Sequence, residues 1–271
     1  MESVFSTLTP AQQSLFLTLY LRALDSGSAA PILGDTRSAE LAATVDYEFG
    51  RLKVQRSMVL DLAVRTKTLD DLIRGFLTRH RDAVVLDLGC GLDPRMQRCN
   101  PPPAVDWYDI DFPVVTEMRE RLLPGSSHLV GADLTTPGWL ATIPTDRPAI
   151  VVADGLMSFL SGDSFRGMTR ALTAHLLGGE FSFNAYTALD LRLANHSATF
   201  RAMHARTVGE GFTDPHEPER WSAGLTLIEE LLLVRAPDVA HFPEPLRSFT
   251  RLCARSSRLS RHGNRVVRYA F

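Results

Sequence analysis

The sequence predicts an α/β protein with a doubly wound, mostly parallel sheet of seven strands, an N-terminal helical cap and a helical lid inserted after the fifth strand. Strands and helices alternate from residue 83 onward, which is typical of a parallel sheet with helices on both faces. Two helical stretches come before the first strand, and a polar helical segment follows the fifth. With 271 residues, 45% of them hydrophobic, the chain is long enough for one large domain with an appended cap.

The cap is expected over residues 1–80. Thr9, Pro10 and Gln12 match a helix start, with Thr as N-cap, Pro at the first helical position and Gln at the capping-box position. Apolar residues then recur at helical spacing until residues 26–28, which read Ser-Gly-Ser. A second helix is expected from about Val54 to Leu77. Both helices precede the core and would contribute to its binding site.

The core is expected over residues 81–271. Its strands are predicted at Val84–Asp87, Val105–Ile110, His128–Ala132, Ile150–Ala153 and Glu180–Ala185. Helices are predicted at Val114–Leu122 and Ser164–Leu176, with a short turn at 137–143. Two more extended segments are Leu225–Val234, which would also make a helix, and Val266–Phe271. A lid at about 187–221 would hang over the carboxyl end of the sheet, where ligands of such folds bind.

The most informative segment is VVLDLGCGLDPR, residues 84–95. A buried strand ends at Asp87, and Gly89 and Gly91 follow, so the backbone can pass close to a ligand. A carboxylate at this strand end suits a ligand with positive charge or with hydroxyl and amine donors, and would repel a bare phosphate. Pro94 stands where the dinucleotide fingerprint needs a third small residue. These features favour S-adenosylmethionine (SAM) over a dinucleotide.

Three more aspartates follow predicted strands. Asp111, twenty positions after the second glycine, can accept hydrogen bonds from ribose hydroxyls, or it can cap a helix that starts near Pro113. Asp133 can accept from the adenine amine while Leu134 packs on the ring, or it can cap a loop. Asp154 follows the fourth strand. Four consecutive strand ends with an acid indicate a ligand with many donors and a cationic part.

The combination of segments resembles one family. It includes LFLTLYLRALDSGSAAPILGD, AVRTKTLDDLIRGFL, VVLDLGCGLDPR, WYDIDFPVV and ADGLMSFL. The chain resembles the class I SAM-dependent methyltransferases of the leucine carboxyl methyltransferase family, in the bacterial branch that includes polyketide O-methyltransferases. The resemblance runs over nearly the whole chain and implies the Rossmann-like fold of these enzymes.

The resemblance also implies cofactor contacts, which fall on Arg65, Asp87, Gly89, Gly91, Asp111, Asp133, Leu134 and Asp154. Arg65 would pair with the SAM carboxylate, which suits the fork of a guanidinium, although a surface position on its helix is the alternative. Asp87 would lie beneath the SAM ammonium. Asp154 stands where the family more often has Glu, so the acid is one methylene shorter and the resemblance does not fix its contact.

The function expected from this resemblance is a SAM-dependent O-methyltransferase acting on a carboxylate or phenolic hydroxyl of a small, polyketide-like molecule. The alternatives are a methyltransferase for the C-terminal carboxylate of a protein, a SAM-binding protein without catalysis, and an NAD-dependent oxidoreductase. The last predicts the third glycine that is missing.

The need for a catalytic base depends on the acceptor. A carboxylate is already ionised at neutral pH, whereas a phenol gains from a general base. His196 and His204 on the lid, and Tyr186 after the fifth strand, are the candidates; the histidines can equally face solvent. Apolar walls are expected from Phe5, Phe16, Tyr20, Met157 and Phe159.

Composition limits the partners. The formal charge of −2 gives no general attraction to nucleic acid or to an anionic membrane. A basic cluster near the C-terminus is expected to be a solvated surface; its members are Arg255, Arg258, Arg261, Arg265 and Arg268. Three cysteines without a CxxC pair fit a reducing cytoplasm. No metal site is expected, and a monomer and a homodimer are both compatible with the sequence.

Overall fold

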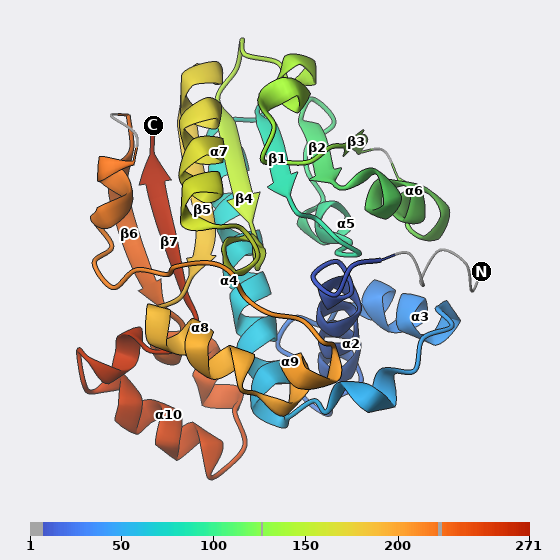
Figure 1. The fold of residues 1–271 in the computed structure, drawn as a ribbon, viewed down its shortest axis with the longest axis vertical. Helices are drawn as coiled ribbons and strands as arrows, with labels where there is room; N and C mark the ends of the chain where they lie inside the picture. Colours follow the sequence, from blue (N-terminus) through green and yellow to red (C-terminus); the bar gives the residue numbers. More distant parts are fainter. Residues whose placement is uncertain (1–7, 126, 222–223) are drawn as a thin grey trace.

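The computed structural model describes residues 8–125, 127–221 and 224–271 (Figure 1). Its sheet has seven strands in the order β3-β2-β1-β4-β5-β7-β6. The strands are β1 (Val84–Leu88), β2 (Asp106–Asp111), β3 (His128–Gly131), β4 (Ala149–Ala153), β5 (Gly179–Ala185), β6 (Thr226–Leu232) and β7 (Arg265–Ala270). The first five are parallel, and β7 pairs antiparallel with both β5 and β6. This confirms the predicted doubly wound, mostly parallel sheet.

The ambiguous segment Leu225–Val234 is a strand. Its residues Thr226–Leu232 pair with β7, and the register shifts between Leu227 and Glu229. Local periodicity could not decide between helix and strand here; the open edge of β7 decides it, because that edge offers hydrogen-bond partners to an extended chain.

The α-helices outside the lid are α2 (Ser14–Ser26), α3 (Thr36–Thr44), α4 (Arg56–Arg79), α5 (Arg95–Cys99), α6 (Pro113–Leu122), α7 (Gly162–His175) and α10 (Leu246–Ala254). The predicted capping box forms, since Thr9 N donates to Gln12 Oε1 at 2.8 Å and Gln12 N to Thr9 Oγ1 at 3.3 Å. It closes a turn ahead of the helix, which itself begins at Ser14. The sequence analysis missed α3, α5 and α10.

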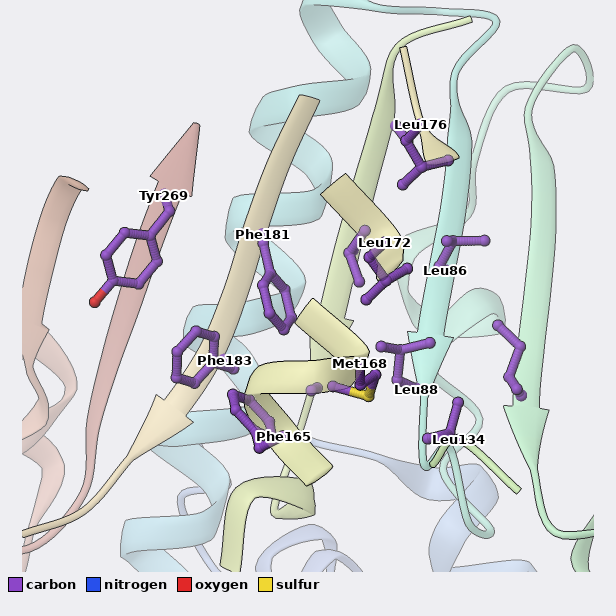
Figure 2. Close-up of a cluster of buried hydrophobic side chains, with 14 of the residues drawn as sticks. Leu86, Leu88, Leu134, Phe165, Met168, Leu172, Leu176, Phe181, Phe183 and Tyr269 are labelled. Atoms are coloured by element: carbon purple, nitrogen blue, oxygen red, sulfur yellow. The ribbon is translucent and has the colours of Figure 1, made fainter. Parts of the chain in front are cut away.

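Helices cover both faces of the sheet. On one face, α7 places Phe165, Met168 and Leu172 against β1, β4 and β5, where they pack with Phe181 and Phe183 (Figure 2). On the other face the second half of α4 packs on β4, β5 and β7, and its apolar side chains share one core with Val85 of β1. The apolar runs of β1 and β4 are therefore buried on both sides, as their continuous hydrophobicity predicts.

The N-terminal helices lie beyond the carboxyl ends of the parallel strands (Figure 1). α4 links them to the core, because its first half contacts α2 and its second half belongs to the layer against the sheet. The division into a cap at 1–80 and a core at 81–271 stays a prediction.

The lid contains two short helices, α8 (Ala188–Asn195) and α9 (Ala198–Ala202), rather than one. Thr187 and Asp190 form a capping box for α8, and Ser197 caps α9 by accepting from Phe200 N. Thr199 Oγ1 donates to Lys53 O at 3.0 Å, so the lid is fastened to the N-terminal region. The lid and α2 thus enclose the same end of the sheet.

The basic cluster near the C-terminus is only partly solvated, so that expectation was wrong for two residues. Arg265 is fully buried and pairs with Glu230 at 2.5 Å, and Arg268 pairs with Glu180 and Glu229, each at 2.7 Å. They belong to β7, where they hold β5 and β6 beside it. None of the helices in the described ranges is both long and apolar enough to span a bilayer.

Candidate active site

A cavity of about 360 Å³ opens at the carboxyl ends of β1, β2, β4 and β5. Its walls come from α2, α4, the turn after β1, the turn after β4 and the lid. The volume lies within the roughly 300–1,000 Å³ of small-molecule sites, and the place is the topological switch between β1 and β4. Of the predicted site residues, the cavity brings together Arg65, Asp87, Gly89, Gly91, Asp111, Asp154 and Tyr186.

The turn after β1 has a backbone conformation that depends on its two glycines. Gly89 and Gly91 have φ angles of 66° and 51°, a region that favours glycine. Gly91 N donates to Asp111 Oδ2 at 2.8 Å, which ties the turn to the end of β2. Burial raises the pKa of Asp111, against the backbone hydrogen bonds that it accepts. The alternative role of Asp111 as a helix cap is wrong, because α6 has Phe112 as its N-cap residue and no side-chain cap.

Arg65 is buried at 6% exposure, so its alternative surface position is wrong. Its Nε lies 2.6 Å from Asp154 Oδ1, and its Nη1 donates to the Tyr186 hydroxyl at 3.0 Å. Burial alone would lower the pKa of Arg65, but Asp154 and Tyr186 outweigh it and the pKa is raised. The guanidinium is therefore a fixed positive charge in the wall of the cavity.

A second buried arginine, which the sequence analysis missed, stands behind this wall. Arg95 contacts Asp70 at 2.8 Å, Asp154 at 3.0 Å, and both Asp87 and Asp93 at 3.1 Å. The acids Asp87 and Asp154, which the sequence did reveal, were a signal for such an arginine, because buried carboxylates need a counter-charge. The acids after β1 and β4 thus belong to one network rather than standing alone.

The network leaves the cavity with surplus negative charge. Burial raises the pKa of Asp87 to about 7; Arg95 opposes the rise, and the acids Asp109 and Asp93 add to it. Among the described lining residues, five aspartates (Asp61, Asp87, Asp93, Asp111, Asp154) face three arginines (Arg22, Arg65, Arg95). This surplus favours a ligand with net positive charge, and SAM, with its sulfonium, ammonium and carboxylate, is such a ligand.

Four predicted residues lie outside the lining of this cavity. Asp133 is exposed and accepts from Thr135 N at 2.9 Å, and Leu134 is buried in the core beside α7. His196 and His204 are exposed on the lid. The adenine contacts and the histidine bases stay predictions, and the two histidines face solvent, as the alternative expected.

Asp61 and Asn264 also line the cavity and escaped the sequence analysis. Asp61 lies one helical turn before Arg65 on α4, and its Oδ2 accepts a hydrogen bond from Asn264 Nδ2. The spacing of four residues from Arg65 was a signal that could have found Asp61. Asn264 immediately precedes β7, and only the antiparallel pairing of β7 with β5 brings it to the site.

The far part of the cavity is apolar. Its side chains are Leu17, Leu21, Met58, Leu62, Phe159 and Phe200. The rings of Phe159 and Phe200 are nearly parallel, at 10°, with centroids 6.4 Å apart. Of the other expected wall residues, Phe16 and Met157 are buried in the core, Tyr20 stacks on Phe49, and Phe5 lies outside the described residues.

The family model described as leucine carboxyl methyltransferase matches residues 12–173. The chain belongs to this family. The tetracenomycin polyketide synthesis O-methyltransferase TcmP of Streptomyces glaucescens is 37% identical over 266 residues, 97% of this chain and 98% of that protein. A SAM-dependent methyltransferase of Gibberella zeae, dpfgK, is 30% identical over 253 residues, 84% of each chain.

Solved structures share the fold of this leucine carboxyl methyltransferase family member. A Thermobifida fusca protein aligns with a TM-score of 0.57 and 18% identity, covering 92% of this chain and 93% of its own. The plantazolicin methyltransferase BamL, in complex with a triazolic desmethylPZN analog and SAH, aligns with a TM-score of 0.53 and 9% identity, covering 95% of this chain and 97% of its own. The fold is that of the Rossmann-like methyltransferases.

The protein is therefore a SAM-dependent methyltransferase, and SAM is its cofactor. The family membership excludes the NAD-dependent oxidoreductase and the binding protein without catalysis. The charge surplus and the open glycine turn of the cavity agree with this cofactor.

Proposed function

We propose that this enzyme transfers the methyl group of SAM to an oxygen of a small, polyketide-like acceptor, either a carboxylate or a phenolic hydroxyl. The observation that carries the proposal is the continuity of one cavity from the glycine turn to the apolar chamber under the lid. A small acceptor can be enclosed there beside the cofactor. The role of TcmP in tetracenomycin polyketide synthesis supports an acceptor of this kind.

The donor end of the cavity has a residue for each part of the cofactor. Gly89 and Gly91 would let the backbone approach its amino-acid part, with Asp87 and the network behind it balancing the ammonium. Arg65 would hold the carboxylate, since its Nη2 enters none of the described hydrogen bonds. Asp111 would accept from the ribose, and Phe112, 39% exposed at the same end, offers a face for the base.

SAM supplies a methyl group on a sulfonium sulfur, which leaves as a neutral thioether. The chain's own residues orient the reactants and exclude water. Water is excluded from the acceptor end by the apolar side chains of α2 and α4 and by Phe159 and Phe200. The Arg65–Asp154 pair fixes the donor end. Burial raises the pKa of Tyr186, so its hydroxyl stays a neutral hydrogen-bonding group at neutral pH.

We also place the enzyme in the cytoplasm, which its three free cysteines support.

Transfer of a deuterated methyl group tests the proposal. The enzyme is incubated with methyl-deuterated SAM and a panel of aromatic acids, phenols and aliphatic acids, and both the small molecules and the proteins of a cell extract are read by mass spectrometry. Label in small aromatic acceptors is expected. Label only in a protein would contradict the small-molecule proposal and favour the protein carboxyl methyltransferase. Loss of the label under mild base separates an ester from an ether.

A further inference from the structure

The apolar chamber of the cavity has two aromatic side chains. Among the described lining residues of the whole cavity, the aromatic ones are Phe112, Phe159, Tyr186 and Phe200. Phe112 follows β2 at the donor end, and the Tyr186 hydroxyl accepts from Arg65 Nη1 at 3.0 Å. Phe159 and Phe200 are therefore the aromatic groups that an acceptor in the chamber would meet.

The two rings are parallel but too far apart to cover each other closely. Their planes differ by 10°, and their centroids lie 6.4 Å apart. The rings of Tyr20 and Phe49, a closely stacked pair, have centroids only 4.8 Å apart. Phe159 and Phe200 are both partly exposed and both line the cavity, so neither ring is fully covered by protein. A flat molecule that stacks on one of these rings lies parallel to the other as well.

Backbone hydrogen bonds tie together the two segments that carry these rings. Phe159 lies in the turn after β4, where Ser158 O accepts from Val208 N at 2.9 Å and from Gly209 N at 3.1 Å. Val208 and Gly209 follow α9, the lid helix that contains Phe200. The lid is thus bonded to the turn at the residue next to Phe159.

Two further contacts restrict movement of the rings. A Cβ at Gly209 would lie 2.3 Å from Met157 O, so any side chain here would displace the backbone of the turn. Thr199, next to Phe200, donates its hydroxyl to Lys53 O at 3.0 Å. The ring positions are therefore set before an acceptor enters, which lowers the entropic cost of binding a rigid molecule that matches them.

We infer that Phe159 and Phe200 determine the specificity of this enzyme for flat aromatic acceptors, whose ring system stacks on both phenyl rings. Stacked aromatic rings attract each other beyond the apolar area that they bury. A puckered, saturated molecule of the same size still gains from burial against the aliphatic side chains of the chamber, but it cannot lie flat on either ring. The inference rests on the proposed function and deepens it by naming the shape of the acceptor.

The test compares 1-naphthoic acid with decahydro-1-naphthoic acid, its saturated counterpart. Both carry one carboxylate on the same bicyclic skeleton, but only the first is flat. Binding of each acid to the enzyme saturated with S-adenosylhomocysteine is measured by isothermal titration calorimetry. Wild type is expected to bind the flat acid roughly 5- to 100-fold more tightly, the worth of two stacked aromatic contacts.

Leucine variants remove one aromatic face at a time and keep an apolar side chain in its place. Phe159→Leu and Phe200→Leu are each expected to weaken binding of the flat acid by roughly 2- to 10-fold. Binding of the saturated acid should stay within roughly twofold of wild type, because it gains nothing from a ring face. Phe249→Leu is the matched control: Phe249 is 64% exposed on α10, outside the cavity lining, and its variant should bind both acids as wild type does.

Three outcomes would overturn the inference. They are wild-type affinities for the two acids within roughly twofold of each other, binding of neither acid, and an equal loss of both acids in the two leucine variants. The last would show that the phenylalanines only fill space. Failure of the proposed function would be seen elsewhere, since no small molecule would then take up the deuterated methyl group, whatever the affinities of the two acids.

Discussion

At the scale of single residues, the Arg65–Asp154 pair decides how the donor end is built. Both side chains are nearly buried, and Asp154 also accepts from Arg95 Nη2 at 3.0 Å. Arg95 is shared with Asp70, Asp87 and Asp93, whereas Nη2 of Arg65 enters none of the described hydrogen bonds. We propose that this nitrogen binds the cofactor carboxylate.

Replacing Arg65 with alanine should weaken cofactor binding. A charge-assisted hydrogen bond of this kind is worth about 1.5–3 kcal/mol, so the Kd of S-adenosylhomocysteine should rise roughly 10- to 100-fold. Isothermal titration calorimetry measures it. Arg74→Ala, on the exposed side of α4 and paired with Asp71, is the matched control and should bind normally. A Kd within twofold of wild type for Arg65→Ala would remove Arg65 from the cofactor site.

Asp87 gives a prediction about pH. Its pKa of about 7 in the folded protein lies above the value of about 3.9 for an unfolded aspartate. The folded state therefore holds a proton that the unfolded state releases, and stability falls as pH rises from about 4 to about 7. Asp87→Asn has no such proton to lose, so its free energy of unfolding should increase relative to that of wild type as the pH rises over that range. Urea unfolding across the range measures it, and parallel pH profiles would contradict the raised pKa.

At the scale of elements, the close approach of β4 and β5 depends on a glycine. Gly179 pairs with Ala149, and a Cβ at Gly179 would lie 1.8 Å from Ala149 O. Gly167, on the exposed face of α7, has open space around it. The same substitution should therefore act in opposite directions at the two sites.

Gly179→Ala should destabilise the protein by about 3 kcal/mol or more, because backbone must move in the middle of the sheet. Gly167→Ala should stabilise it by about 0.5–1 kcal/mol through the better helix propensity of alanine. Chemical denaturation of both variants measures the pair. Similar stabilities for the two variants would show that the β4–β5 contact is looser than described.

The elements that the sequence predicted are those whose signal is local. β1 and β4 are continuous apolar runs, and α7 repeats Phe165, Met168 and Leu172 at helical spacing. The missed α5 is five residues long, and its buried face is Arg95 and Cys99, so it has no apolar stripe to recognise. Asn264 and Arg265 reach their places only through the antiparallel insertion of β7, which no local pattern reveals.

At the scale of the whole molecule, buried charges join the N-terminal helices to the sheet. Arg22 of α2 lies 3.6 Å from Asp93 after β1, and Arg98 of α5 lies 2.8 Å from Asp35 before α3. The acids Asp93 and Asp70 are shared with Arg95, which lies behind the Arg65–Asp154 wall of the cavity. The cap, the glycine turn and the donor site are thus held by one set of contacts, and a ligand in the cavity should stabilise all three.

S-adenosylhomocysteine should therefore raise the melting temperature of the whole protein. At a hundred times its Kd the gain is about 2.7 kcal/mol, or roughly 5–10 °C for a chain of this size. Differential scanning fluorimetry measures it, with NAD at the same concentration as the control. A shift with NAD and none with S-adenosylhomocysteine would contradict the cofactor assignment.

The central claim is that one cavity holds the cofactor against Arg65 and Asp111 and a small acceptor in the apolar chamber under the lid. A crystal structure with S-adenosylhomocysteine and 1-naphthoic acid tests it most directly. The account predicts the cofactor carboxylate on Arg65, its ribose on Asp111, and the naphthalene ring among Met58, Leu62 and Phe200. A cofactor bound with its ribose away from Asp111, or a ring bound outside this chamber, would contradict it.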